Sequence, residues 1–167
     1  EENSNYYKRL LWMLPNGQYG IYDKSNCFAF AGEDEHYTAG TKRLIASVKG
    51  WKINLLVCYD LRFPVFSRNR EDFDLMLYVA NWPATRRTHW RQLLIARAIE
   101  NQACVVGVNR IGSDARGLDY SGDSLAIGGD GIMLGDMENE NGAARVVLSG
   151  AALQSYREGF PCQLDAD

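Results

Sequence analysis

Apolar runs near the start of the chain, separated by residues that favour turns, predict two β-hairpins. Asn16-Gly17 lies between apolar or aromatic runs, which favours a type I′ turn because both central residues of that turn need positive φ. The second connection is Lys49-Gly50. Leu55-Leu56-Val57 is a continuous apolar run, as is typical of a strand buried on both faces of a sheet. The predicted strands pair 10–14 with 18–23 and 43–48 with 51–57.

The middle of the chain alternates buried strands with one long helix. Residues 86–102 carry apolar side chains near helical spacing, with Arg91, Gln92 and Arg97 between them. Pro64 favours the start of a short helix, where its missing N–H costs nothing. This alternation is typical of an α/β fold. The other predicted elements are strands 73–80, 105–108, 124–127, 132–135 and 145–148, helices 65–70 and 151–157, and loops 33–42 and 112–122.

The composition is that of a globular protein, and it does not indicate which reaction the protein could catalyse. The 167 residues fit one domain, 1–167, and 46% hydrophobic with 23% charged residues is ordinary for a globular chain. A net charge of -3 suggests no basic surface, so we expect no nucleic-acid partner. The apolar stretches are too short to span a bilayer, so we expect no membrane partner. The four cysteines form no C-x-x-C pair, which predicts free thiols and a cytoplasmic location. With only two histidines besides, we expect no metal site.

Cys58 is the first candidate for chemistry, because it directly follows the buried strand 51–57. Such a strand would fix the sulfur, and the backbone N–H groups that follow could face a developing oxyanion. The alternative is that Cys58 is a small core hydrophobe, since free cysteine is among the most buried residue types. The local pattern does not separate these two interpretations.

Lys24 is the second candidate, and it closes the predicted strand 18–23. A lysine at a strand end is ordinarily solvated. Near a cysteine, its positive charge would lower the pKa of the thiol and favour the thiolate. The same charge would stabilise the oxygen of a tetrahedral intermediate.

Several motifs, in order, resemble those of the nitrilase superfamily of carbon–nitrogen hydrolases. The nucleophile motif is matched at 56–64, Leu-Val-Cys-Tyr-Asp-Leu-Arg-Phe-Pro, and the lysine motif at 22–24, Tyr-Asp-Lys. Further matches are Asn81-Trp82-Pro83, the helical segment 96–101, Asn109-Arg110-Ile111-Gly112 and Gly122-Asp123-Ser124. The details are most similar to bacterial ω-amidases, which hydrolyse the distal amide of 2-oxoglutaramate and related 2-oxo acid monoamides.

The resemblance implies a Glu–Lys–Cys triad that forms a thioester and releases ammonia from a small-molecule amide. Carried over by motif, Cys58 is the nucleophile, and Lys24 and the backbone N–H of Tyr59 hold the oxyanion. Glu33 matches a second glutamate that the superfamily carries after the lysine. The alternative for Glu33 is a solvated loop carboxylate, like many acidic residues in loops. No metal or organic cofactor is implied, and a homodimer is expected.

The chain departs from the superfamily at two places. The general-base glutamate lies many tens of residues before the lysine in relatives, whereas only 23 residues precede Lys24 here. Glu1 and Glu2 stand in a polar start and do not fit that role, so no general base is assigned. We therefore expect an α/β/β/α four-layer sandwich of the nitrilase type that lacks its N-terminal strands. Ser25-Asn26-Cys27 replaces the basic residue and histidine that usually follow the lysine.

Substrate recognition is predicted in the loop after the strand 73–80. Ligands of α/β sheets bind outside the carboxyl ends of the strands, and a guanidinium of Arg86 could pair with a substrate carboxylate there. Arg86 and Arg87 could equally be solvated arginines at a helix start. Trp82 could wall the pocket or pack in the core. Glu100 is expected to be a buried acid paired with an arginine, because a buried carboxylate needs a partner.

Two alternatives to the ω-amidase hypothesis stay open. One is another hydrolase with the same triad, such as a nitrilase or a carbamoylase. The other belongs to a different class, a non-catalytic fragment or pseudoenzyme that survives as a folding or dimerisation module, since losing the general base costs roughly 10²–10⁴ in rate.

Overall fold

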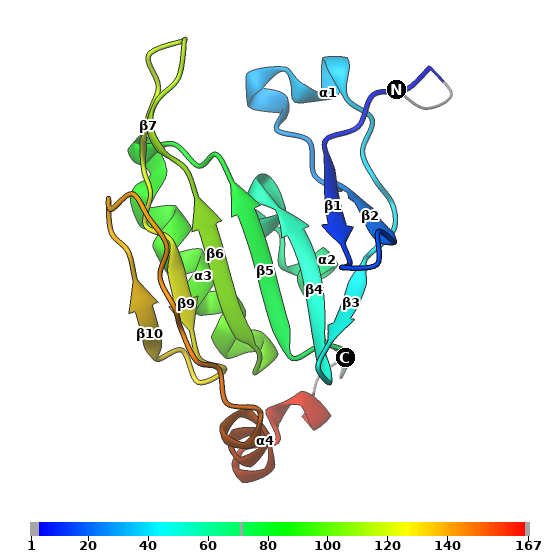
Figure 1. The fold of residues 1–167 in the computed structure, drawn as a ribbon, viewed down its shortest axis with the longest axis vertical. Coiled ribbons are helices and arrows are strands. Elements are labelled where there is room, and N and C mark those ends of the chain that lie inside the picture. The colour runs from blue at the N-terminus through cyan, green and yellow to red at the C-terminus, as the bar shows by residue number, and fades with distance from the viewer. Residues whose placement is uncertain (1–3, 71, 166–167) are drawn as a thin grey trace.

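The computed structural model describes residues 4–70 and 72–165, and its largest element is a six-stranded mixed sheet (Figure 1). Glu1 and Glu2 lie outside the described residues. The strand order is β10-β9-β6-β5-β4-β3, in which the three central strands are parallel and the outer pairings are antiparallel. The strands are β3 (Ile45–Val48), β4 (Trp51–Val57), β5 (Leu75–Ala80), β6 (Cys104–Asn109), β9 (Leu125–Ile127) and β10 (Met133–Asp136). The predicted α/β fold class is confirmed.

Helices cover one face of this sheet. The long helix α3 (Arg87–Asn101) follows β5, and the short helix α2 (Pro64–Ser67) follows β4 (Figure 1). Trp90, Leu94 and Ala98 of α3 are buried in the main core together with apolar side chains of the central strands. At Gly107 of β6, an added Cβ would lie 2.6 Å from Leu94 Cδ1 and 2.8 Å from Trp90 Cζ2, so α3 packs directly on the strand there.

A hairpin covers part of the opposite face. It consists of β1 (Arg9–Met13) and β2 (Tyr19–Asp23), and in Figure 1 it lies in front of β3 and β4. Leu10 and Trp12 pack against a second core cluster that includes Ile53 and Leu55 of β4. The described residues therefore stack in three layers: helices, the large sheet and this hairpin.

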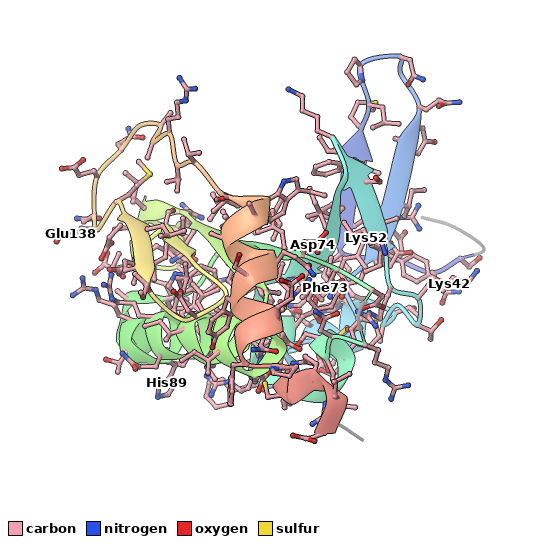
Figure 2. The ribbon with its side chains drawn as sticks, turned by 90° about the horizontal axis from the view of Figure 1, so that it is seen from below. Lys42, Lys52, Phe73, Asp74, His89 and Glu138 are labelled. Carbon is pink, nitrogen blue, oxygen red and sulfur yellow. The ribbon has the colours of Figure 1, made fainter. Side chains whose placement is uncertain are left out.

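The helix α4 (Gly150–Gly159) crosses the lower end of the sheet, as Figure 2 shows from below. Its Arg157 donates hydrogen bonds to the Asp74 carboxylate and to the carbonyl of Phe73, each at 3.0 Å. Phe73 and Asp74 precede β5 and lie beside α4 in Figure 2. The short 3₁₀ turn η4 (Cys162–Asp165) follows. No helix among residues 4–70 and 72–165 is both long and apolar enough to cross a membrane.

The two hairpin turns differ from each other in type. At Asn16-Gly17 only Gly17 has positive φ, and the Leu14 N–H donates to the Gln18 carbonyl at 2.8 Å. This is a three-residue loop with a left-handed last residue, so the predicted type I′ turn is wrong here. At Lys49-Gly50 both residues have positive φ, 49° and 85°, as a type I′ turn requires.

Three other predictions of local structure are wrong. Loop 112–122 contains a small hairpin of β7 (Ile111–Ser113) and β8 (Asp119–Ser121), and loop 33–42 begins with the helix α1 (Glu33–His36). Acidic residues in the first turn favour α1 through the helix dipole. Segment 145–148 is not a strand, although its Val146 side chain lies close to Gly135 of β10. The segment therefore contacts the edge of the sheet through a side chain and does not form backbone hydrogen bonds with β10 as a further strand would.

Packing at Gly107 generates a stability prediction. We expect Gly107→Ala to lower the free energy of unfolding by about 1–3 kcal/mol, because the new methyl group would overpack the contact with α3. Urea denaturation measures this difference. Gly159→Ala is the matched control, since nothing lies within 4 Å of its added Cβ, and its effect should stay within about 0.5 kcal/mol. Equal stability of the two variants would contradict the close approach of α3 to β6.

Candidate active site

Cys58 stands where β4 turns into the 3₁₀ helix η2 (Cys58–Arg62). Its φ is 48°, in the left-handed region that residues with a side chain rarely adopt. The sulfur lies 3.9 Å from the carbonyl oxygen of Asn81, the residue that follows β5. The thiol is therefore held at the carboxyl ends of two parallel strands, where α/β sheets bind ligands.

Lys24 follows β2 and is only 2% exposed. The alternative considered from the sequence, a solvated lysine at a strand end, is therefore wrong. Its backbone is held from two sides: its N–H donates to the Lys8 carbonyl, and its carbonyl accepts from the Gly40 N–H, both at 2.9 Å. A Cβ on Gly40 would lie 2.1 Å from the carbonyl oxygen of Asp23, so only glycine allows this approach.

Glu33 holds the ammonium group of Lys24. Its carboxylate accepts hydrogen bonds from Lys24 Nζ and Lys8 Nζ, each at 2.6 Å, and from the Phe28 N–H at 2.9 Å. Burial alone raises the pKa of Glu33, but these hydrogen bonds outweigh burial and leave the pKa below its usual range. Its side chain is 14% exposed, whereas the adjacent Asp34 and Glu35 are exposed. Of three neighbouring acids, only Glu33 joins the lysine.

The electrostatic field at Cys58 combines opposing effects. Burial raises the pKa of the Cys58 thiol, the Lys24 charge lowers it, and the charges of Glu33 and Asp60 raise it. Burial prevails, so the pKa lies above its ordinary value. The Lys24 ammonium also lies 5.9 Å from the centre of the ring of Tyr59, the residue that follows Cys58 in η2. Lys24, Glu33, Cys58 and Tyr59 are therefore brought together.

Tyr59 occupies the first turn of η2, where backbone N–H groups have no partner within the helix. Its ring packs against Phe28 at 4.7 Å and against Phe63 at 5.1 Å between centroids. The residue thus presents a backbone donor beside the sulfur and an aromatic surface along the site.

The arginines 86 and 87 have different surroundings. The guanidinium of Arg86 lies 5.5 Å from the centre of the Phe28 ring and pairs with no carboxylate among residues 4–70 and 72–165. Arg87 instead donates two hydrogen bonds of 2.7 Å to Asp123. Trp82 is buried, packs against Trp90, and donates from Nε1 to the Arg86 carbonyl at 2.8 Å. A pocket-lining role for Trp82 stays a prediction.

Two buried polar residues were missed by the sequence analysis. Asp60 is 1% exposed and accepts five hydrogen bonds. Arg97 is buried on α3 and donates twice to the carbonyl of Leu61 in η2. Arg97 also pairs with Glu100, as expected for that acid, but Glu100 is exposed and the prediction of its burial is wrong. Both Asp60 and Arg97 are charged residues among apolar neighbours in the sequence. That position could have indicated a buried charge with hydrogen-bond partners, because a charge is buried only when it is paired.

No group of three or more potential metal ligands gathers among the described residues. The site so far consists of a thiol, a buried ammonium, carboxylates and backbone donors, and the absence of a cofactor stays a prediction.

Comparison with known proteins adds a family relationship. Residues 1–158 match the sequence model of the family described as carbon-nitrogen hydrolase. The chain is 51% identical to "Omega-amidase YafV" of Escherichia coli, over 100% of this chain and 66% of that protein. It is 32% identical to "2-oxoglutaramate amidase" of Bacillus subtilis, over 96% of this chain and 62% of that protein.

A solved structure shows the same fold. The crystal structure of a CN-hydrolase superfamily protein from Xanthomonas campestris superposes with a TM-score of 0.94 at 46% identity, over 100% of this chain and 66% of that chain. Its description reports an arsenic adduct in the active site of that protein. The chain thus spans about two thirds of the length of the relatives it matches.

The hydrogen bonds to Glu33 generate a pH prediction. A carboxyl group whose folded pKa is lowered contributes stability above its unfolded pKa of about 4.3, and this contribution is lost as pH falls through the lower folded pKa. We expect Glu33→Gln to lower the free energy of unfolding by about 1.5–3 kcal/mol at pH 7. Below about pH 4 the difference from the parent should shrink.

Urea denaturation at a series of pH values measures this difference. Glu35→Gln makes the same change of charge at an exposed neighbouring position and should leave the pH dependence of the parent unchanged. A constant difference between the parent and Glu33→Gln down to about pH 3 would contradict the charged hydrogen bonds at Glu33.

Proposed function

We propose an amide-hydrolysing function on one premise: the chain belongs to the carbon–nitrogen hydrolase family. The resemblance to the nitrilase superfamily drawn from the motifs is confirmed by this membership. The complete protein is proposed to hydrolyse the terminal amide of 2-oxo acid monoamides such as 2-oxoglutaramate. The names of the Escherichia coli and Bacillus subtilis relatives support that substrate class. The observation that carries the chemistry is the buried Lys24 ammonium, fixed by Glu33 near Cys58.

The first half of the proposed reaction forms a thioester. The Cys58 sulfur attacks the amide carbon, and the carbonyl oxygen becomes an oxyanion. Lys24 and the Tyr59 backbone N–H stabilise that oxygen, an arrangement whose single donors are typically worth 10²–10³ in rate. The carbon–nitrogen bond then breaks, the nitrogen takes up the proton that the thiol has given up, and ammonia leaves.

The second half returns the enzyme to its starting state. A water molecule adds to the thioester carbon, a second oxyanion forms at the same place, and the carbon–sulfur bond breaks. The products are the carboxylic acid and the Cys58 thiol. No general base is assigned among the described residues, because Glu33 already accepts three hydrogen bonds and holds Lys24.

Arg86 supports the proposed substrate class. A 2-oxo acid monoamide carries a carboxylate at the end opposite its amide, and a guanidinium pairs well with such a group. Arg86 borders the site through Phe28, whose ring also contacts Tyr59. Its charge is not already taken by a carboxylate of the described residues.

Ammonia release by the full-length protein tests the proposal. We expect turnover of 2-oxoglutaramate and a loss of at least about 10³ in kcat for Cys58→Ala, because the covalent step disappears. Cys162→Ala is the control, since this thiol lies in η4 at the far end of the chain. Turnover of simple nitriles or N-carbamoyl amino acids without turnover of 2-oxoglutaramate would refute the proposed substrate class. The absence of all turnover would favour the non-catalytic alternative.

The role of Arg86 has its own prediction. We expect Arg86→Gln to raise KM for 2-oxoglutaramate by roughly 10–100-fold, since a hydrogen bond to a charged group is worth about 1.5–3 kcal/mol. A simple aliphatic amide without a carboxylate should show no such change. Arg87→Gln is the control at the adjacent position. A parallel loss on both substrates would indicate a structural effect and contradict carboxylate binding by Arg86.

A further inference from the structure

Asp60 lies two residues after the nucleophile and is almost fully buried. One of its carboxylate oxygens, Oδ2, accepts the N–H of Val57 at 2.9 Å and the hydroxyl of Tyr22 at 2.7 Å. Val57 immediately precedes Cys58 at the end of β4. Tyr22 belongs to β2 and stands two residues before Lys24. One oxygen therefore contacts the strand ends that carry both Cys58 and Lys24.

The second oxygen strengthens the same connection. Asp60 Oδ1 accepts the backbone N–H of Asn26 at 2.9 Å, and the Asn26 amide and the Ser25 hydroxyl at 3.0 Å each. These donors directly follow Lys24. Together with Tyr22 they bracket the lysine on both sides in sequence.

Asp60 is the point where the two segments join. Within the described part of the chain, every hydrogen bond between residues 22–26 and residues 57–60 ends on the Asp60 carboxylate. The hydrogen bonds of Lys24 itself go to Lys8, Gly40 and Glu33, none of which belongs to the nucleophile turn, residues 57–60. The Glu33 bond orients the ammonium and the two backbone bonds hold the strand end, but none of them reaches the turn that carries the sulfur.

The charge of Asp60 works against the thiolate. Both Asp60 and Glu33 raise the pKa of Cys58, whereas Lys24 lowers it. Burial, the hydrogen-bonded Asp114 and, last, an ionised Cys58 raise the pKa of Tyr120 of β8, so this phenol is a further titratable neighbour of the sulfur. A carboxylate kept here for its field would therefore disfavour the reactive form of the sulfur, so its benefit has to be geometric.

We propose that Asp60 is a positioning residue, whose buried carboxylate ties the end of β2 to the nucleophile turn and thereby fixes the Lys24 ammonium beside Cys58. This role rests on the proposed function. Ser25 and Asn26 supply three of the five donors.

Asp60→Asn tests the proposal well because all five groups around Asp60 donate hydrogen bonds to its carboxylate, and the amide nitrogen of asparagine cannot accept them. An amide placed with its nitrogen at Oδ2 would face the Val57 N–H, and placed the other way it would face the Asn26 N–H. Neither backbone group can reverse its role, so one orientation loses the Val57 bond within the nucleophile turn and the other loses the Asn26 bond between the two segments. Asp60→Asn keeps the shape, removes the charge and weakens the tie.

The test is the pKa of Cys58 in the full-length protein, measured from the rate of iodoacetamide alkylation between about pH 6 and about pH 11 and read by peptide mass spectrometry. A purely electrostatic role predicts a lower pKa in Asp60→Asn. The positioning role predicts a higher pKa, with alkylation near pH 8 slower by about 10-fold for each unit of increase. Lys24→Met gives the shift expected when the ammonium is lost completely.

A gentler variant covers the case in which Asp60→Asn fails to fold. Tyr22→Phe combined with Ser25→Ala removes two donors on the lysine side and leaves the charge and the Val57 contact in place. The pKa of Cys58 should rise here too, by less. Asp123→Asn is the matched control, because Asp123 is another buried carboxylate with several partners on a different element.

The outcomes separate the two ideas. An unchanged or lower pKa of Cys58 in Asp60→Asn and the double variant, with a higher pKa in Lys24→Met, would overturn the positioning role alone. An equal rise in Asp123→Asn would also overturn it, because general loosening would then explain the effect. An unchanged pKa in Lys24→Met would instead count against the proposed function.

Discussion

The ion pair between Lys24 and Glu33 is the interaction on which the candidate site depends. A buried ammonium group is costly unless a charged partner and hydrogen bonds compensate for its lost water. Lys24 has no water-exposed alternative, since it is 2% exposed, so the chain must bring a carboxylate to it. The segment after β2 does this by folding back through α1, and Gly40 lets the returning chain touch the strand end.

The fold was predictable where a repeating pattern decides the structure. The helical spacing in 86–102 and the apolar run before Cys58 correspond closely to α3 and β4. Prediction failed where partners decide. Segment 145–148 has the composition of a strand, but it passes over Gly135 without joining a ladder. Asn16-Gly17 and Lys49-Gly50 both allow positive φ, yet only the second hairpin uses it at both positions.

The candidate site was predictable to the same extent. Motif order could single out Cys58 and Lys24, but it could not tell which of three consecutive acids would reach the lysine. The helix α1 decides this, because it directs Glu33 inward and leaves Asp34 and Glu35 exposed. Asp60 was missed for a similar reason. Most of its partners are more than thirty residues away in sequence, so no local pattern reveals them.

Burial and charge together limit how Cys58 can react. Burial raises the pKa of the Cys58 thiol most, the Lys24 ammonium lowers it, and two carboxylates raise it, so the pKa lies above its ordinary value. In the proposed reaction the thiol would keep its proton until the sulfur attacks the amide carbon. At that moment negative charge moves from sulfur to the carbonyl oxygen, and a fixed ammonium can stabilise both positions. In the proposed reaction, an ammonium held between the sulfur and the carbonyl oxygen is therefore more useful than a permanent thiolate. This agrees with the presence of two carboxylates near the sulfur, because they disfavour the thiolate.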